Sequence, residues 1–360
     1  MKIVFFVRDL GLGGVERCVA LVAEGLAARG FDVTIALLGG NCNLWEKHTA
    51  GVRVVSLAQC WHGKKPWTWP AGWRAARRLI SDADVVIAAT FLMPLYMAWA
   101  ATRGLNKRLI AWVHGPKAEL DAFARMNPVH RAACQFVYRR VREIVCVSEH
   151  ARDSLSRWLG KSVQAGWRVM PNFVEPMTPR AVRQPGSPLE LLFVGRIAVE
   201  KQPHLWLDTL QALARRGIAA RLTVVGDGPL QDWLAGEAGR RGLSESLVLA
   251  GRRDDVADFL RAADLLLLTS SFEGCPLVVL EAMQAGLPVV STNAGGVYEL
   301  FADRRDDFIA AQASGEALAA TIAAQLPRYA ELVEWERRRA QDYAPDALLD
   351  KWADLAKSSY

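Results

Sequence analysis

The segment DLLLLTSSFEGCPLVVLEAMQAGLPVVST, residues 264–292, has a β-α-β pattern with two carboxylates inside it. Both of its ends are short apolar runs of strand length. Pro276 suits the start of a helix, where no N–H is needed. Glu273 is therefore expected in the loop after the first strand and Glu281 in the helix, with oxygens available to hydroxyl groups. The alternative is a capping role for Glu281 and a solvated loop position for Glu273.

The same alternation extends over the chain in both directions. Strand-like runs such as KIVFFV, DVTIALL and EIVCVS, and later LELLFVGR and RLTVVGDG, are separated by helical patterns, which predicts parallel sheets covered by helices. The pattern stops at residues 171–188, which hold five prolines. We therefore predict two doubly wound α/β domains, residues 1–177 and 178–335, and a helix in residues 336–360 that packs back on the first domain.

Length and composition narrow the class of protein. A chain of 360 residues exceeds the usual limit for one hydrophobic core, which favours two domains. The six cysteines are scattered without a C-x-x-C pair, which argues against a zinc site and a disulfide framework. The first apolar run ends before Arg8 and is too short for a signal peptide, so we expect a cytoplasmic protein.

Charge is distributed unevenly along the chain. Residues 1–177 hold 24 Lys/Arg and 13 Asp/Glu, which leaves 20 and 25 for the other residues. A basic first half is expected to meet an anionic partner. Nucleic acid, anionic lipid and a phosphorylated substrate all fit this charge.

Several residues that follow strands could carry chemistry, because open parallel sheets bind ligands at the carboxyl ends of their strands. Arg196 and Lys201 would suit a diphosphate, with solvated surface cations as the alternative. Gly14 belongs to a glycine-rich turn that would let backbone amides approach a phosphate, but the turn lacks the third glycine of the dinucleotide fingerprint. Gly251 and Arg252 lie in a turn of the kind that can enclose a nucleobase.

His114 follows a strand of the first domain, so it is either a cleft residue or a packed core histidine. Asp82 and Asp84 imitate a metal-binding D-x-D pair, but they precede their strand and so belong to the other edge of the sheet. No metal site is predicted.

In this order and setting, Arg196, Lys201, Glu273 and Glu281 resemble the retaining glycosyltransferases of family 4, whose GT-B architecture has two Rossmann-like domains facing a central cleft. The E-x7-E element formed by the two glutamates is the most specific part. The resemblance covers almost the whole chain, through GLGGVER, VHG, VSEHARDSL, PNFVE, FVGRIAVEKQP, VVGDGPL and SSFEGCPLVVLEAMQAGLPVVSTNAGGVYEL.

The resemblance implies a role for each position. Glu281 would bind the ribose of a nucleotide-sugar donor and Glu273 its sugar, while Arg196 and Lys201 would hold the diphosphate. His114 would contact the sugar near the reacting carbon. The remaining donor-binding positions would be Gly14, Gly251, Arg252, Gly274, Cys275 and Leu277. Pro276, which has no N–H, replaces the glycine that many relatives have at that place.

The implied reaction is transfer of a sugar from its nucleotide diphosphate, with UDP the most frequent carrier in the family, and with retention of the anomeric configuration. The leaving phosphate itself would take the proton of the acceptor. The resemblance implies no metal and no other cofactor.

The segment WHGKKPWTWPAGWRAARRLI, residues 61–80, mixes tryptophans with cations. This composition is typical of a segment at an anionic membrane surface, and a basic helix whose tryptophans pack on the core is the alternative. We expect a peripheral protein on the inner face of the cytoplasmic membrane, with a lipid-linked, lipopolysaccharide or polysaccharide acceptor. The residues on this acceptor side would be Lys64, Lys65, Trp67, Trp69, Arg74, Arg77 and Arg78.

Two other functions remain open. A nucleotide-sugar epimerase or hydrolase of the same fold would act without an acceptor. A non-catalytic, membrane-associated partner would retain only the cleft, although four intact site residues argue against it. Nucleic-acid binding would leave the paired glutamates unexplained, so we expect no nucleic-acid partner.

Overall fold

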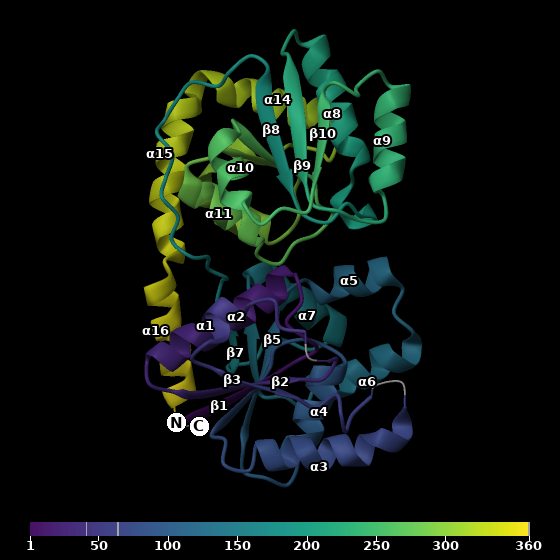
Figure 1. Ribbon diagram of the computed structural model, residues 1–360, viewed down its shortest axis with the longest axis vertical. Coiled ribbons are helices and arrows are strands. Elements are labelled where there is room, and N and C mark those ends of the chain that lie inside the picture. Colours follow the sequence, from purple (N-terminus) through teal and green to yellow (C-terminus); the bar gives the residue numbers. More distant parts are fainter. Residues whose placement is uncertain (41, 63–64, 359–360) are drawn as a thin grey trace. The chain divides into compact units, whose positions relative to one another are not determined.

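The structure is a computed structural model that describes residues 1–40, 42–62 and 65–358. It divides into two compact units, one formed by Met1–Phe173 with Pro345–Tyr360 and the other by Val174–Ala344. Each unit has its own sheet of parallel strands with helices on its faces (Figure 1). The predicted α/β class, with two Rossmann-like domains, is confirmed.

The first unit contains a sheet in the order β3-β2-β1-β4-β5-β6-β7. Its strands are almost continuously apolar because helices cover both faces of the sheet. In β1, for example, every residue after Lys2 is buried. The strands are β1 (Lys2–Val7), β2 (Asp32–Leu37), β3 (Arg53–Ser56), β4 (Val85–Ala88), β5 (Arg108–Val113), β6 (Glu143–Cys146) and β7 (Trp167–Val169).

The helices of this unit follow the strands as β-α-β crossovers. They are α1 (Gly14–Ala28), α2 (Glu46–Thr49), α3 (Trp69–Leu79), α4 (Met93–Thr102), α5 (Lys117–Ala124), α6 (Pro128–Tyr138), α7 (Glu149–Leu159) and α16 (Pro345–Lys357), with a 3-10 turn at Pro66–Thr68.

The second unit repeats the plan with five parallel strands in the order β10-β9-β8-β11-β12. The strands are β8 (Leu189–Val194), β9 (Ala220–Val225), β10 (Leu247–Gly251), β11 (Leu265–Leu268) and β12 (Val289–Ser291). The helices are α8 (His204–Arg215), α9 (Gln231–Arg240), α10 (Val256–Ala262), α11 (Leu277–Ala285), α12 (Val297–Leu300), α13 (Arg305–Phe308), α14 (Gly315–Gln325) and α15 (Tyr329–Ala340), with 3-10 turns at Val199–Lys201, Ala302–Arg304, Leu326–Arg328 and Gln341–Tyr343.

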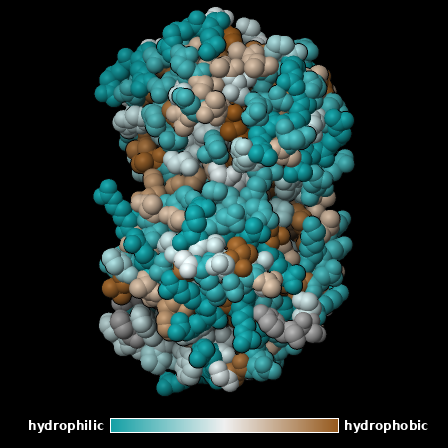
Figure 2. Space-filling model, turned by 180° about the vertical axis from the view of Figure 1, so that it is seen from behind, coloured by the Kyte–Doolittle hydropathy of each residue, from teal (hydrophilic) through white to brown (hydrophobic). Residues whose placement is uncertain are grey.

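The longest uncharged run, residues 85–101, forms strand β4 and most of helix α4, with Pro94 in the first turn of the helix. In the described part of the chain, no helix combines the length and the apolar character needed to cross a bilayer. On the face drawn in Figure 2, hydrophobic residues appear as separate spots among hydrophilic ones.

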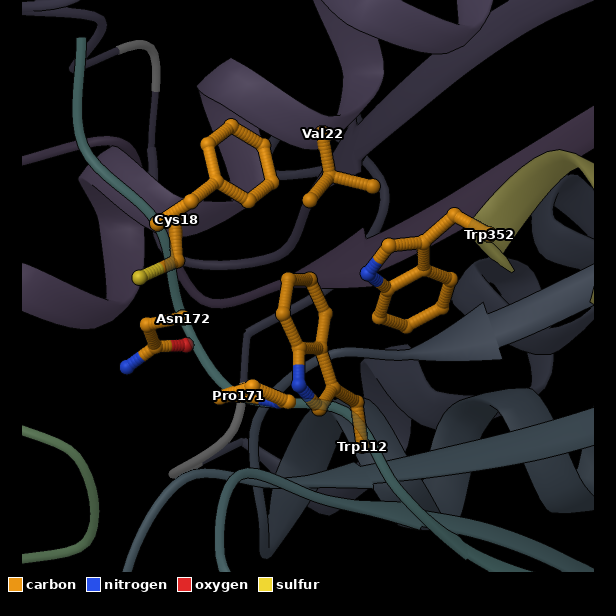
Figure 3. A pocket seen from close by; sticks show the side chains of 7 residues that line it. Cys18, Val22, Trp112, Pro171, Asn172 and Trp352 are labelled. Atoms are coloured by element: carbon orange, nitrogen blue, oxygen red, sulfur yellow. The ribbon is translucent and has the colours of Figure 1, made fainter. Parts of the chain in front are cut away.

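Both predicted domain limits need correction. The first unit ends at Phe173 and not at residue 177, and the returning segment begins at Pro345 and not at residue 336. Residues 336–344 belong to the second unit because α15 packs against α11 there. Only α16 joins the first unit, where Trp352 packs on Trp112 of β5 with ring centroids 4.6 Å apart (Figure 3).

The proline-rich segment after Phe173 contains no helix or strand, yet it is anchored to the second unit. The backbone N–H of Arg180 donates to the Ala285 carbonyl over 3.1 Å. Its buried guanidinium donates to the carbonyls of Ala263 and Gly286 and to the hydroxyl of Tyr329. The break in the sequence pattern marked this segment as a domain boundary but did not indicate that it contains a buried arginine.

Candidate functional site

Two loops of the second unit bring together a cation, a carboxylate and a hydroxyl. Lys201 follows β8, and its Nζ lies 2.5 Å from Oε1 of Glu273, in the loop after β11. Ser270 Oγ donates to the same carboxylate oxygen over 2.7 Å. The side chains of Lys201 and Glu273 are 22% and 16% exposed. The charges thus neutralise each other at a site that a ligand can still reach.

A second set of hydrogen bonds fixes these loops to each other. Thr269 Oγ1 donates to the Lys201 carbonyl over 2.6 Å and accepts a hydrogen bond from Nε1 of the buried Trp206, also over 2.6 Å. The Ser271 amide donates to the Glu200 carbonyl over 2.8 Å. Buried polar groups that are fully paired in this way hold the loops in one arrangement.

A third loop, residues 292–296 after β12, sets the position of Glu273. The Glu273 amide donates to the Ala294 carbonyl over 2.7 Å, and the Gly296 amide donates to the Glu273 carbonyl over 3.1 Å. A Cβ on Gly296 would lie 1.6 Å from the Gly274 carbonyl oxygen. Only glycine permits the two backbone segments to lie this close. The sequence analysis did not single out Gly296.

Helix α11 carries the second glutamate. Pro276 is its N-cap residue and Leu277 its first residue, while Glu281 lies on the helix and is 8% exposed. Glu273 precedes the helix, as predicted. Gly274 and the buried Cys275 connect the two glutamates, beside helix amides that have no partner within the helix.

The other predicted residues of this unit lie on neighbouring turns after strands. Arg196 follows β8, is exposed and forms no ion pair within residues 1–40, 42–62 and 65–358. Gly251 ends β10, and its carbonyl accepts the Gly226 amide over 2.8 Å. The exposed Arg252 lies 3.8 Å from the Asp227 carboxylate. Arg196, Gly251 and Arg252 therefore lie on turns at one edge of the same sheet.

Gly14 and His114 belong to the first unit. Gly14 is the first residue of α1, and the extended Gly13 is its N-cap. The Gly11 carbonyl in the same turn accepts the indole N–H of Trp45 over 2.9 Å. Burial raises the pKa of Glu16, which opens the helix beside this turn. The turn therefore presents a helix N-terminus with a carboxylate that is easier to protonate than usual.

His114 lies directly after β5, as predicted. Its ring contacts that of Trp112 in a tilted arrangement, with the centroids 4.3 Å apart. Both ring nitrogens are buried, and within the described residues neither makes a hydrogen bond of ordinary geometry. Burial lowers the pKa of His114 to about 3, and the nearby charge of Lys117 acts in the same direction. The Ala89 backbone has the opposite effect, but it does not offset the other two. The imidazole is therefore neutral near pH 7.

Lys117, three residues further on, is a residue that sequence reasoning missed. It begins α5, is 7% exposed, and its Nζ lies 4.1 Å from the centre of the Phe91 ring. Burial lowers the pKa of this lysine to about 8. Its place shortly after a strand was a usable signal, as it was for Ser270 after β11.

The tryptophan-rich segment divides into packed and exposed parts. Trp61 is buried and stacks on Trp69, with ring centroids 5.7 Å apart. Trp73 donates its indole N–H to the Ala100 carbonyl over 3.0 Å, and Arg77 donates to the Arg103 carbonyl over 2.6 Å. These two residues therefore attach α3 to α4.

The remaining acceptor-side residues face solvent. Trp67 is 75% exposed and Trp69 43%, and Lys65, Arg74 and Arg78 are exposed as well. Lys64 lies outside the described residues.

Within residues 1–40, 42–62 and 65–358, no group of three or more His, Cys, Asp or Glu side chains could hold a metal ion. The D-x-D pair that precedes β4 makes ordinary structural contacts. Asp82 accepts from Nζ of Lys2 over 2.8 Å, and Asp84 accepts from the Lys2 amide over 2.7 Å.

Comparison with known proteins identifies the fold and the class of enzyme. A family model described as Glycosyltransferase Family 4 matches residues 12–177, and one described as Glycosyl transferases group 1 matches residues 188–327. The chain belongs to the GT-B glycosyltransferases. The match to each unit by a separate model agrees with the two parallel sheets.

Relatives of this glycosyltransferase include glycogen synthase of Mycobacterium tuberculosis, 29% identical over 80% of this chain and 76% of the relative. The amylovoran biosynthesis glycosyltransferase AmsD of Erwinia amylovora is 23% identical over 95% of both chains. Among solved structures, Anabaena HepE in complex with UDP and glucose superposes with a TM-score of 0.83 at 18% identity, over 100% of both chains.

Proposed function

We propose that this glycosyltransferase moves a sugar from a UDP-sugar to a saccharide or lipid-linked acceptor in the assembly of a surface polysaccharide, with retention of the anomeric configuration. The observation that carries the proposal is the contact of Lys201, Ser270 and Glu273 on adjoining loops of one sheet edge. The presence of UDP and glucose in HepE and the role of AmsD in amylovoran biosynthesis support the donor and the acceptor class.

Donor binding would rearrange the Lys201–Glu273 ion pair. The diphosphate attracts the ammonium of Lys201, joined by the exposed Arg196. Glu273 is then released to accept hydrogen bonds from hydroxyls of the donor sugar. The backbone of the loop 292–296 holds Glu273 in place during this exchange. Glu281 on α11 would bind the ribose hydroxyls.

Departure of UDP increases the negative charge on its phosphate oxygens. Arg196, Lys201 and the amino end of α11 would stabilise that charge without a metal ion. The leaving phosphate would take the acceptor proton on the same face of the sugar. His114, neutral because its pKa is about 3, would contact the sugar as a hydrogen-bonding group and not as a cation.

Incubation with a panel of nucleotide sugars, followed by mass spectrometry, tests the donor. Wild-type protein should bind a UDP-sugar and hydrolyse it slowly without an acceptor. Release of an epimer would favour the epimerase alternative, and fast hydrolysis with no stimulation by any saccharide would favour the hydrolase. Failure of every nucleotide sugar to bind would reject the proposal.

Charge-matched variants test the ion pair. Lys201→Gln should weaken donor binding by about tenfold to a hundredfold, the cost of one charge-assisted contact in a semi-buried site. Arg215→Gln removes a cation from an exposed pair with Glu316 and should leave donor affinity unchanged. EDTA should leave the transfer rate unchanged, and a loss that Mg²⁺ restores would refute metal independence.

We further propose peripheral attachment to an anionic membrane through the exposed residues of α3 and the turn before it. Trp67 and the cations Lys65, Arg74 and Arg78 would enter the interface. A Trp67→Ala, Arg74→Gln, Arg78→Gln variant should sediment less with anionic liposomes than wild type. Equal sedimentation would show that this segment does not bind membranes.

A further inference from the structure

A pocket lies on the first unit, at the opposite edge of its sheet from His114. The pocket has a volume of about 680 Å³ and is formed mainly by residues 83–84, 102–109, 140–143 and 356–358. These residues surround the amino ends of β4, β5 and β6. His114 follows the carboxyl end of the six-residue strand β5, about 20 Å away. The pocket is therefore separate from the proposed reaction site.

Cations outnumber acids around this pocket. The two acids already have partners. Glu143 pairs with Arg108 over 2.6 Å, and Asp84 accepts the Lys2 amide. Arg108 also donates to the carbonyls of residues 355, 356 and 358, so it serves the structure. Five further cations form no ion pair with any described residue: Arg103, Lys107, Arg140, Arg142 and Lys357.

Aromatic rings position two of these cations. The guanidinium of Arg103 lies 5.3 Å from the Trp99 ring centre, and that of Arg140 lies 3.4 Å from the Phe136 ring centre. Trp99 and Phe136 themselves meet edge to face, 5.7 Å apart. A guanidinium held on a ring loses less freedom when it binds an anion, and its planar fork matches phosphate oxygens.

We infer that this pocket binds a phosphate-bearing ligand, supplied either by the headgroup of an anionic lipid or by a small phosphorylated compound. Its volume lies in the usual range for small-molecule sites. A phosphate would relieve the repulsion among these cations, which form no ion pair within the described residues. Arg77 of α3 donates to the Arg103 carbonyl, so the basic helix α3 continues the same charged surface.

Paired substitutions in the full chain test the inference. The pocket pair Arg103→Gln with Arg142→Gln removes two exposed cations of the site. The control pair Arg53→Gln with Arg168→Gln removes the same charge from exposed positions outside it. Each protein is melted in rising inorganic phosphate at constant ionic strength, and sedimented with phosphatidylglycerol or phosphatidylcholine vesicles.

We expect phosphate to raise the melting temperature of the pocket pair less than that of wild type and of the control pair. If a lipid headgroup is the ligand, the pocket pair also loses affinity for phosphatidylglycerol vesicles by about thirtyfold, the combined effect of two cations near an anionic surface. A reduced phosphate response with unchanged vesicle binding assigns the pocket to a small phosphorylated compound. Equal behaviour of the pocket and control pairs in both assays overturns the inference.

Donor binding, measured on the same three proteins (wild type, the pocket pair and the control pair), separates this site from the proposed function. The pocket lies outside the proposed donor-binding loops, so all three proteins should bind a UDP-sugar equally. Loss of donor binding in every protein would reject the transferase proposal and leave the pocket result intact.

Discussion

At the scale of single residues, Lys117 has a charge that the protein keeps almost wholly out of water. Burial lowers the pKa of its ammonium to about 8 from an ordinary value of 10.5. The charged form is thus less favourable in the folded state than in the unfolded chain. Burial of the ammonium therefore lowers the free energy of unfolding by its full amount below pH 8. This loss of stability disappears as the pH rises from 8 to 10.5. Its position shortly after β5, three residues from His114, makes Lys117 a residue to test in the reaction.

Replacement of this lysine by methionine should separate stability from activity. We expect Lys117→Met to raise the free energy of unfolding at pH 7 by up to about 3 kcal/mol, less the lost contact with Phe91, and to raise it little at pH 10.5. Sugar transfer should fall at least tenfold. Denaturant melts at the two pH values and the kcat/KM of transfer measure both effects. Unchanged kcat/KM would show that Lys117 has a structural role only.

Glu336 is a buried acid in the second unit. Its Oε1 accepts the Val289 amide over 3.2 Å, and burial raises the pKa of the carboxyl well above 4.5. Below pH 4.5 the carboxyl is protonated in both states and costs nothing. Above that value the unfolded chain releases the proton while the folded chain keeps it, so stability falls as the pH rises towards the folded pKa.

Glu336→Gln keeps an oxygen for the Val289 amide and removes the proton linkage. The variant should therefore melt higher than wild type at pH 7 and at the same temperature at pH 4. Thermal melts at the two pH values test this, with the exposed Glu245→Gln as control. A stability gain of equal size at both pH values would show that protonation of Glu336 does not affect folding stability.

At the scale of elements, the β11-α11-β12 segment shows how much of the site local sequence patterns predict. Pro276 marked the start of α11 in the sequence, so the loop position of Glu273 and the helical position of Glu281 were predictable from local rules. The hydrogen bonds from Ser270 and from the loop 292–296 to Glu273 were not predictable. They depend on which loops meet at the sheet edge, and no local pattern encodes that.

Gly296 is the position in these loops that tolerates least change. A Cβ there would lie 1.6 Å from the Gly274 carbonyl oxygen, so Gly296→Ala must displace the backbone that carries Glu273. We expect this variant to fold but to lose at least tenfold in donor affinity, measured by titration calorimetry with a UDP-sugar.

A second glycine provides the matched control. A Cβ on Gly236 in α9 would meet nothing within 4 Å, so Gly236→Ala should bind donor normally and gain up to about 1 kcal/mol of stability. Normal donor affinity of Gly296→Ala would show that the loop adapts.

The tryptophan-rich segment, residues 61–80, shows what sequence patterns leave undecided. Trp61, Trp67, Trp69 and Trp73 come from one basic segment with one composition, and the sequence left membrane contact and core packing equally open. The structure buries Trp61 and exposes Trp67. The difference arises because Trp61 fills the space beside Gly72, where an added Cβ would lie 2.8 Å from the tryptophan side chain.

At the scale of the whole molecule, the carboxyl-terminal helix α16 completes the first unit. Trp352 is 2% exposed and packs on Trp112, which is 3% exposed. The side chains that surround the two tryptophan rings come from α1 and from the segment 171–173 (Figure 3). The core of this unit therefore requires residues from both ends of the chain.

Truncation of this tryptophan should destabilise the protein. We expect Trp352→Ala to cost about 3 to 5 kcal/mol, since it empties a buried aromatic site, whereas Trp67→Ala at a 75% exposed position should cost less than about 0.5 kcal/mol. Chemical denaturation followed by circular dichroism measures both. A cost for Trp352→Ala as small as that of Trp67→Ala would show that α16 contributes little to the first unit.

The sequence by itself determined the two parallel-sheet units, the loop and helix positions of the paired glutamates, and the strand-end positions of Arg196, Lys201 and His114. These features follow from local periodicity and from the rule that chemistry gathers at the carboxyl ends of strands. Only the tertiary structure decided that Lys201 meets Glu273 and that residues 336–344 stay with the second unit. It also decided that five cations without an ion pair among the described residues surround one pocket. Contacts between residues distant in sequence depend on packing and chain topology, which local patterns do not carry.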